Sequence, residues 1–300
     1  MIVIKLRGGL ANQMFQYALG RHLSILHKVP LYLDLVHFEK EQTVEKTIRD
    51  FGLNKCNIQA NIASNKNINE GKGWYDNALK RKVNTVINKI KPYYKVNIIK
   101  ERSSGFDKKI LEAPENCYVE GFWQCENYFK DIRETILKDL SFKAEPKGLN
   151  LQYQNDIKAC NSVSIHVRRG DYVNNKHYQN IHQVLSVDYY NKAINTILKT
   201  VDNPVFYVFS DDPEWVKAHI KTEYKTVFVD HNMETPHEDI RLMQTCKHNI
   251  IANSTFSWWA AWLNNNPGKI VVAPEKWYKK VDLENPDITP LSWIKIENCN

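Results

Sequence analysis

Two adjacent arginines follow an apolar run in the middle of the chain, an arrangement suited to binding an anion. The run, residues 162–167, predicts a strand that carries His166 and delivers Arg168, Arg169 and Asp171 to its carboxyl end. Ligands of open α/β sheets bind at that end, and paired guanidiniums hold phosphate oxygens through charge-assisted hydrogen bonds. We expect Asp171 to brace one guanidinium and His166 to reach a base or ribose. The alternative is an ion-pair cluster on the surface.

A carboxylate pair ends a second predicted strand, over residues 205–210. Asp211 and Asp212 precede Pro213, which is well suited to begin a helix. Adjacent acids can bind magnesium, accept protons or cap that helix, so capping and a ligand-site role both stay open. No Asp-x-Asp occurs in the chain, which disfavours a diphosphate held by a metal. We therefore expect arginine to neutralise a leaving phosphate, with no metal and no cofactor.

A third strand-to-helix junction is rich in hydroxyls. Asn253, Ser254, Thr255 and Ser257 lie where a predicted strand gives way to a helix, and a helix amino terminus attracts anions. Ser254 can serve as the N-cap residue, bind the anion, or do both. We expect the tryptophans of the helix to pack its core rather than stack on a sugar: Trp258, Trp259 and Trp262.

A glycine-rich loop follows the first predicted strand. Gly8 and Gly9 allow a ligand to approach the backbone closely. The loop lacks both the Gly-x-Gly-x-x-Gly pattern and the Gly-Lys-Ser/Thr ending of a P-loop. Asn12 and Gln13 either bind sugar hydroxyls or cap the helix that follows.

The histidines and cysteines show no metal-binding or nucleophilic pattern. The lone histidines are expected in solvated or buried structural positions: His177, His182, His231 and His237. The six cysteines are scattered without Cys-x-x-Cys spacing, which favours free thiols in a reducing cytosol.

Alternating strands and helices must position these residues. In the first half we expect strands over residues 2–6, 31–33 and 117–122, with helices over 14–27 and 127–140. The stretch from 55 to 115 is Asn- and Lys-rich and weakly patterned, so we predict a mostly helical and irregular segment.

The second half alternates more regularly. Predicted strands cover residues 162–167, 205–210, 225–229, 249–252 and 270–273, and predicted helices cover 187–199, 214–221, 238–247 and 255–263. This pattern indicates a parallel sheet with helices on both faces. A polar stretch over 144–150 favours a boundary between two α/β domains, residues 1–150 and 151–300, that face a central ligand cleft.

The charge of the chain is unevenly distributed. Its net charge is +7, and residues 80–109 hold ten Lys or Arg against Glu101 and Asp107. This segment is either a solvated helical face or a patch for anionic lipid or acidic glycan. It shows no nucleic-acid-binding motif. With no signal peptide and no run of about 18 apolar residues, we expect a cytoplasmic chain, at most peripheral on the inner face of a membrane.

Four segments together resemble the bacterial α-1,2-fucosyltransferases of glycosyltransferase family 11. Residues 8–18 read Gly-Gly-Leu-Ala-Asn-Gln-Met-Phe-Gln-Tyr-Ala, and residues 166–172 read His-Val-Arg-Arg-Gly-Asp-Tyr. Residues 121–129 read Gly-Phe-Trp-Gln-Cys-Glu-Asn-Tyr-Phe, and the block over 246–259 ends in Asn-Ser-Thr-Phe-Ser-Trp-Trp. The arginine motif by itself is shared with α-1,6- and protein O-fucosyltransferases. The combination covers nearly the whole chain.

The resemblance implies a GT-B-like fold and transfer of L-fucose from GDP-fucose. The acceptor would be the 2-hydroxyl of a terminal galactose on an oligosaccharide, O-antigen or similar glycan, with inversion and no required metal. The donor would bind the C-terminal domain, and the N-terminal domain, with the glycine loop, would serve the acceptor. The alternatives are α-1,6 or protein O-linked transfer, or a non-catalytic anion-binding module.

The resemblance also implies roles for individual residues. Arg168 would contact the β-phosphate with support from Arg169, and Asp171 would hold the arginine geometry. His166 would lie near the nucleotide, and Asp239 would face the nucleoside. The residues implied to contact phosphate are Ser254, Thr255 and Ser257. The general base is not identified by spacing, and Asp171 is one candidate.

Overall fold

The computed structural model describes residues 1–39, 50–73, 91–175 and 179–298, and the chain divides into two compact units, Met1–Ala144 and Glu145–Asn300. The expected break after residue 150 is too late, because that position lies inside helix α6 (Gly148–Lys158). Helix α6 contacts β6 and α11 and so belongs to the second unit. The polar stretch predicted as a boundary thus holds the break at its start.

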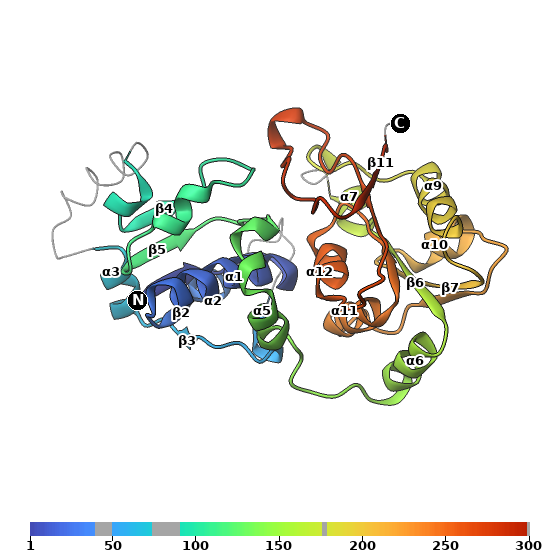
Figure 1. Cartoon of the computed structure of the whole chain (residues 1–300), viewed down its shortest axis with the longest axis horizontal. Coiled ribbons are helices and arrows are strands. Elements are labelled where there is room, and N and C mark those ends of the chain that lie inside the picture. Colours follow the sequence, from blue (N-terminus) through green and yellow to red (C-terminus); the bar gives the residue numbers. More distant parts are fainter. Residues whose placement is uncertain (40–49, 74–90, 176–178, 299–300) are drawn as a thin grey trace. The chain divides into compact units, whose positions relative to one another are not determined.

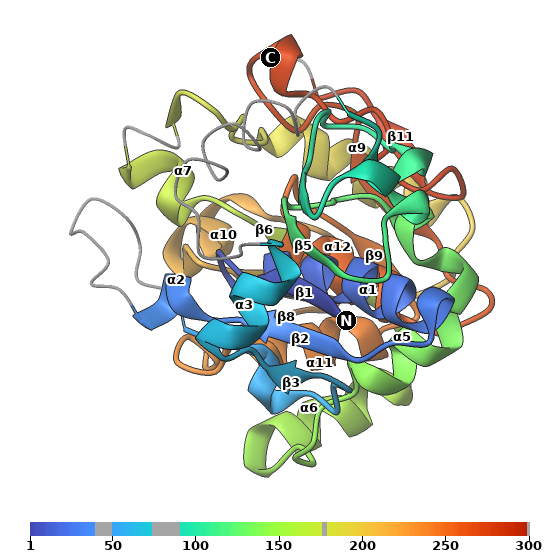
Figure 2. The same cartoon turned by 90° about the vertical axis from the view of Figure 1, so that its left-hand side faces the viewer.

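The first unit is built on a five-stranded parallel sheet in the order β3-β2-β1-β5-β4 (Figure 1). The strands are β1 (Ile2–Lys5), β2 (Leu31–Asp34), β3 (Asn61–Ile62), β4 (Ile98–Lys100) and β5 (Cys117–Glu120). Helix α1 (Leu10–His27) begins at the glycine loop, and α3 (Asn65–Gly71) lies over the sheet with Ile68 packed near Val3 and Tyr118 (Figure 2). The strand–loop–helix–strand opening is confirmed.

Shorter helical elements complete this unit. They are α2 (Val36–Glu39), α5 (Arg133–Asp139) and the 3₁₀ turns Leu53–Lys55, Tyr93–Lys95, Lys108–Glu112, Glu126–Tyr128 and Lys130–Ile132. The single helix predicted over 127–140 is therefore two 3₁₀ turns followed by α5.

The prediction of a mostly helical and irregular segment over 55–115 holds for α3, the 3₁₀ turns and the irregular chain that the structure describes, but it missed two strands. This stretch supplies β3 and β4, the two edge strands of the sheet, which have two and three residues. Strands this short show no alternation that a sequence pattern could reveal. Four of the basic residues between 91 and 109 lie on two 3₁₀ turns and β4, and Lys91 and Arg102 lie outside these elements, so this part is not a helical face. Residues 80–90 lie outside the described part.

The second unit holds a six-stranded parallel sheet in the order β11-β10-β9-β6-β7-β8. The strands are β6 (Asn161–Val167), β7 (Pro204–Ser210), β8 (Thr226–Val229), β9 (His248–Ile250), β10 (Val271–Pro274) and β11 (Ile294–Ile296). Read from β8 to β11, this is the doubly wound order in which the first and fourth strands are neighbours. Both units are thus parallel α/β structures, as the sequence indicates.

Helices cover both faces of this sheet (Figure 1). They are α7 (Gly170–Asn174), α9 (Val187–Leu198), α10 (Pro213–His219), α11 (Pro236–Thr245) and α12 (Thr255–Leu263), with a 3₁₀ turn at Val281–Leu283. Every strand and helix predicted beyond residue 160 is present within three residues at each end. Helix α6 and strand β11 were not predicted, because one is polar and the other is largely exposed.

Strand β6 presents two chemically different faces. Val163 and Ile165 join the apolar core formed with α9 and α10. The alternate residues turn toward α11 and α12, where Asn249 donates to the Ser164 hydroxyl at 2.8 Å and Ser257 contacts His166. The apolar face secures the strand, and the polar face places an imidazole beside the start of α12.

Candidate functional site

The strand order of the second sheet reverses between the neighbouring strands β6 and β9. They pair directly, with Ile165 opposite Ile250, while β7 follows on one side and β10 on the other. Ligands of doubly wound sheets bind in the crevice at the carboxyl ends of such strands. Arg168 and Arg169 follow β6, and the turn carrying Ser254 follows β9. The fold therefore brings the arginine pair and the hydroxyl-rich turn to one edge.

The two arginines are held by the two carboxylates that follow β7. Arg168 Nη1 lies 2.9 Å from Asp211 Oδ2, and Asp211 Oδ1 accepts a 2.8 Å hydrogen bond from the Arg169 amide. Arg169 Nε donates to Asp212 Oδ2 at 3.1 Å. Asp212 also caps α10 by accepting from the Trp215 amide at 3.2 Å. Both roles left open for this carboxylate pair, capping and the ligand site, are therefore compatible with the structure.

Asp211 braces Arg168, and the bracing expected of Asp171 stays a prediction. The backbone of Asp171 lies in α7, and its side chain is outside the described residues. Sequence reasoning missed the Arg168–Asp211 pair because its members are 43 positions apart and belong to neighbouring strands. The signal that could have found it is that both residues directly follow strands predicted to be parallel.

The two arginines differ in their surroundings. The Arg169 guanidinium lies 4.0 Å from the centre of the Trp215 ring, whereas Arg168 lies 5.8 Å from the Tyr172 ring. Their side chains are 17% and 24% exposed. Arg169 is thus packed into the protein, and Arg168 is the guanidinium nearer to solvent.

Gly170 is required by the close approach of Asp211. A Cβ atom at this position would lie 2.7 Å from Asp211 Oδ2, the oxygen that contacts Arg168. Real Cβ atoms do not come this close to a heavy atom. Any larger residue must therefore displace the carboxylate that orients Arg168.

His166 is a buried, neutral imidazole. Its Nδ1 lies 2.9 Å from the Ser257 hydroxyl, and its ring centre lies 5.5 Å from that of Phe256. Burial lowers the pKa of His166 to about 4, so the ring carries no charge near neutral pH. A neutral imidazole can exchange hydrogen bonds with a nucleotide, but it contributes no positive charge to phosphate binding.

Ser257 and Asn253 make hydrogen bonds within the protein, and Asn253 Oδ1 is buried without a partner. The Ser257 hydroxyl is buried and contacts His166, the Ala252 amide and the Ser254 carbonyl. Asn253 is also buried, and its Nδ2 donates to the carbonyls of Gln183 and Trp277. Ser257 thus positions His166, and its implied phosphate contact stays a prediction.

Ser254 caps α12 by accepting a 3.3 Å hydrogen bond from the Phe256 amide. The predicted N-cap is thus confirmed. Thr255 is the first residue of the helix and is partly exposed. The first-turn amides of a helix have no intrahelical acceptor, and no acidic side chain lies in this turn. The start of α12 can accept an anion. The tryptophans of the helix are buried in its packing, as expected: Trp258, Trp259 and Trp262.

Asp239 lies in an amide cluster near the start of α11. Its Oδ1 accepts from Asn232 Nδ2 at 2.8 Å, and Asn232 exchanges hydrogen bonds with Asn150. Burial raises the pKa of the Asp239 carboxyl to about 7. No contact joins this cluster to the arginine pair within the described residues, so its nucleoside role stays a prediction.

The glycine loop of the first unit is rigidly organised. Gly8 has φ +78°, a left-handed conformation that favours glycine, and Asn12 Oδ1 accepts from Gln124 at 3.0 Å. Gln13 is fully buried, donates to the carbonyls of Gly8 and Asp50, and accepts from the Gly52 amide. The predicted ligand or capping role of Gln13 is therefore wrong, because its amide is used inside the protein.

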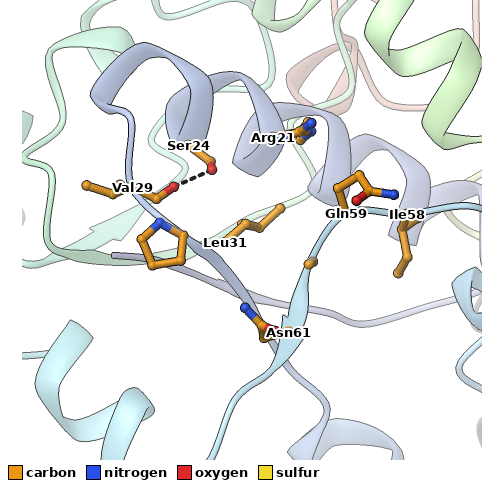
Figure 3. A pocket seen from close by; sticks show the side chains of 9 residues that line it. Arg21, Ser24, Val29, Leu31, Ile58, Gln59 and Asn61 are labelled. Carbon is orange, nitrogen blue, oxygen red and sulfur yellow. Dashed lines mark hydrogen bonds between the residues drawn. The ribbon is translucent and has the colours of Figure 1, made fainter.

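A polar hollow of about 400 Å³ opens at the other edge of the first sheet (Figure 3). Arg21 reaches it and pairs with buried Asp139 at 2.8 Å, and Tyr17 donates to the same carboxylate at 2.7 Å. No residue predicted from the sequence lines it. Its lining residues are Arg21, Ser24, Val29, Pro30, Leu31, Ile58, Gln59, Ala60 and Asn61. The ion pair with Asp139 gives Arg21 a structural role.

Three further findings concern metals, thiols and membranes. Among the residues with described positions, no group of three His, Cys, Asp or Glu side chains is placed to hold a metal ion. Five cysteines within the described ranges are free thiols, and Cys299 lies outside them. In the part of the chain that the structure covers, no helix has the length and apolar character needed to cross a membrane.

The two parallel α/β units form a GT-B-like architecture, and the arginine pair follows β6, where the strand order of the second sheet reverses. Residues 76–297 match the family model described as Glycosyl transferase family 11, so the chain belongs to this family and is a glycosyltransferase. The resemblance seen in the sequence is thereby confirmed.

Named relatives agree with this assignment. The chain is 35% identical to an Escherichia coli protein named Alpha-1,2-colitosyltransferase, over 99% of each chain. It is 30% identical to the Mus musculus Galactoside 2-alpha-L-fucosyltransferase Sec1, over 50% of this chain and 46% of that one. Among solved structures, mutant FUT1 of Arabidopsis thaliana in complex with GDP matches with a TM-score of 0.50 and 10% identity, over 94% of this chain and 74% of that one. This last likeness concerns the fold alone.

Proposed function

We propose that this glycosyltransferase moves L-fucose from GDP-fucose to the 2-hydroxyl of a terminal galactose on a glycan, with inversion and without a metal. The observation that carries the proposal is Arg168, which Asp211 orients at 2.9 Å beside the turn that starts α12. A guanidinium and a helix amino terminus at one sheet edge are suited to a diphosphate.

Arg168 is the group that assists departure of the nucleotide. As the bond between the anomeric carbon and the β-phosphate oxygen breaks, the sugar gains oxocarbenium character and the phosphate gains negative charge. An oriented guanidinium stabilises that charge more in the transition state than in the ground state. Removing such a donor typically lowers the rate about 100- to 1000-fold.

The neighbouring residues position this group. Arg169 and Asp211 fix the turn after β6, and Gly170 leaves room for the Asp211 carboxylate. Ser254 and Thr255 offer their hydroxyls and the first amides of α12 to the diphosphate. The neutral His166 ring, held by Ser257, faces the nucleotide. We assign the nucleoside end of the donor to Asp239.

The general base that receives the proton of the attacking hydroxyl is not identified; Asp171 is one candidate, and we favour its bracing role. Asp171→Asn distinguishes a base from a bracing carboxylate. A base predicts loss of the acidic limb of the pH–rate profile with unchanged GDP affinity. Weaker GDP affinity with an unaltered profile assigns Asp171 to bracing instead.

The name of the Escherichia coli relative gives a second candidate donor. Colitose is L-fucose without its 3-hydroxyl, so the two sugars differ by one hydrogen-bonding group. The relative aligns with 99% of this chain and its name specifies α-1,2 transfer of colitose. The Mus musculus relative is named for transfer of fucose to the 2-position of a galactoside. The two names therefore share the linkage but differ in the sugar that is transferred.

One assay tests donor, linkage and class together. The protein is incubated with GDP-fucose or GDP-colitose and a panel of galactose-ended oligosaccharides, with EDTA added in a parallel series, and the product linkage is read by NMR. We expect an α-1,2 fucosyl product that is insensitive to EDTA. An α-1,6 or peptide-linked product refutes the proposed linkage. GDP binding without any product favours a non-catalytic anion-binding module.

We also propose peripheral contact with an anionic membrane from the cytoplasmic side. The support is the exposed basic side chains around β4, which include Lys91, Lys95, Lys100 and Arg102. Flotation with vesicles containing 30% anionic lipid should retain the protein at low salt. Equal recovery with neutral vesicles would contradict electrostatic attachment.

A further inference from the structure

A second arginine lies at the carboxyl edge of the first sheet. Strands β1 and β5 pair side by side, and the loops that follow them meet, since Gln124 donates to Asn12 at 3.0 Å. Arg7 lies two residues after β1, and its guanidinium lies 4.1 Å from the centre of the Phe122 ring, in the loop after β5. This edge is where open parallel sheets bind ligands.

The Arg7 side chain has no hydrogen-bond acceptor of its own. Its Nε is buried without a partner, and its terminal nitrogens make no ion pair or hydrogen bond with any residue the structure describes. The Arg7 backbone is fixed, because the buried Gln16 amide donates to its carbonyl and accepts from its N–H. A partly desolvated cation without an acceptor is unfavourable in the free protein. The Arg7 guanidinium is therefore suited to bind an anion.

Two acids act on the charge of Arg7: Glu120, which pairs with Lys5 and Lys100, and Glu101, which is also already used. The two carboxylate oxygens of Glu101 accept from the amides of Phe122 and Trp123 at 2.7 and 2.9 Å. Trp123 is buried with φ +56°, a conformation that non-glycine residues keep only when their surroundings enforce it. Glu101 thus fixes the turn that presents the Phe122 ring to Arg7. The ring and the guanidinium form a stacked pair whose outer edge is a rigid fork of N–H donors.

The hydrogen-bond donors at this edge of the first sheet indicate the class of ligand that it binds. Gly8, with φ +78°, lets the Asn12 side chain lie against it, since a Cβ there would be 2.8 Å from Asn12 Nδ2, and this Nδ2 has no acceptor among the described residues. We propose that Arg7, stacked on Phe122, binds an acidic group of the acceptor, a carboxylate or a phosphate. The proposal rests on the function proposed above, in which Arg168 of the other unit serves the donor diphosphate.

Matched acceptors test this assignment. The acceptors are galactose β-linked to a hexyl chain that ends in a methyl, a carboxylate or a phosphate. Wild type should show a kcat/KM about tenfold or more higher for one of the acidic acceptors, the size expected of a charge-assisted hydrogen bond. Arg7→Gln should bring the ratio close to one, leaving the neutral acceptor and the KM for GDP-fucose unchanged. Arg7→Lys should retain part of the preference, because an ammonium keeps the charge but not the fork.

Controls separate binding from folding and from turnover. Lys66→Gln removes an exposed cation of the same unit, on α3, and should leave the preference intact. No variant should melt below wild type. Calorimetry of the acidic acceptors without donor gives the same comparison when no transfer occurs, so the Arg7 assignment is tested even if the proposed function fails. Equal affinity of wild type for acidic and neutral acceptors, a preference that survives Arg7→Gln, or a raised KM for GDP-fucose alone would each overturn it.

Discussion

At the scale of single residues, the site depends on carboxylates that orient guanidiniums. Arg168 and Arg169 were predicted from their position after a strand, whereas their partners Asp211 and Asp212 were predicted only as a nearby pair with several possible roles. Which oxygen meets which nitrogen depends on the register between β6 and β7, with Val167 opposite Ser210. That register is a tertiary property, so the sequence could name the residues but not the contacts.

Gly170→Ala tests the orientation of Arg168 without touching any charge. The new methyl would lie 2.7 Å from Asp211 Oδ2 and should turn the carboxylate away from Arg168. We expect kcat to fall about tenfold or more, because misplaced catalytic groups lose rate steeply. Gly268→Ala is the matched control, since its nearest atom would be 3.8 Å away. Equal activity of both variants would show that Asp211 does not set the geometry of Arg168.

Asp239→Asn tests the buried carboxyl by its pH dependence. The folded pKa is raised to about 7 from an ordinary value of 3.8. The native state therefore holds its proton while the unfolded state releases it, and wild-type stability falls as pH rises from about 4 to 7. Thermal unfolding should show the variant more stable than wild type at pH 8, by about 2 °C or more, and nearly equal at pH 4.

Asp230→Asn tests the opposite dependence of stability on pH. Lys217 lies 2.8 Å away and lowers the pKa of the Asp230 carboxyl through its hydrogen bond and charge. The stability from this pair is present above the unfolded pKa and lost as pH falls through the folded one. This variant should therefore be less stable than wild type at pH 8 and lose that difference in acid. The same sign of pH dependence for both variants would contradict the account of Asp239.

At the scale of elements, the strands and helices of the second unit followed from periodicity, while those of the first unit did so only in part. The long α1 and the buried strands β1, β2 and β5 have clear patterns. Edge strands β3 and β4 are too short to show one. The roles of loop residues were harder to predict. The sequence allows the Gln13 amide to bind a ligand, whereas the structure gives it three backbone partners.

Asp212 joins an element to the site, since it both caps α10 and holds Arg169. Asp212→Ala should lose both functions and lower the melting temperature by about 2–4 °C, the effect of a cap worth about 1 kcal/mol. Asp212→Asn keeps an oxygen for the Trp215 amide and should melt close to wild type. Its GDP-fucose KM should still rise, because the charge facing Arg169 is gone. Identical melting of Ala and Asn variants would show that the cap adds nothing.

At the scale of the whole molecule, two parallel sheets each bring donors to a carboxyl edge. The second unit offers Arg168 beside the start of α12, and the first offers Arg7 beside the glycine loop. The motifs identified the family without any structure. They gave no sign of Arg7, because its significance rests on an unpaired guanidinium stacked on Phe122, a ring 115 positions away.

The catalytic role of Arg168 is tested most directly by the turnover of Arg168→Ala with saturating GDP-fucose and a galactose-ended acceptor. We predict that kcat falls at least about 100-fold while the melting temperature stays within 2 °C of wild type, and that Arg168→Lys is also strongly impaired. Arg102→Ala, which removes an exposed guanidinium of the first unit, should remain active. Retention of more than a tenth of the wild-type rate by Arg168→Ala would contradict the central claim.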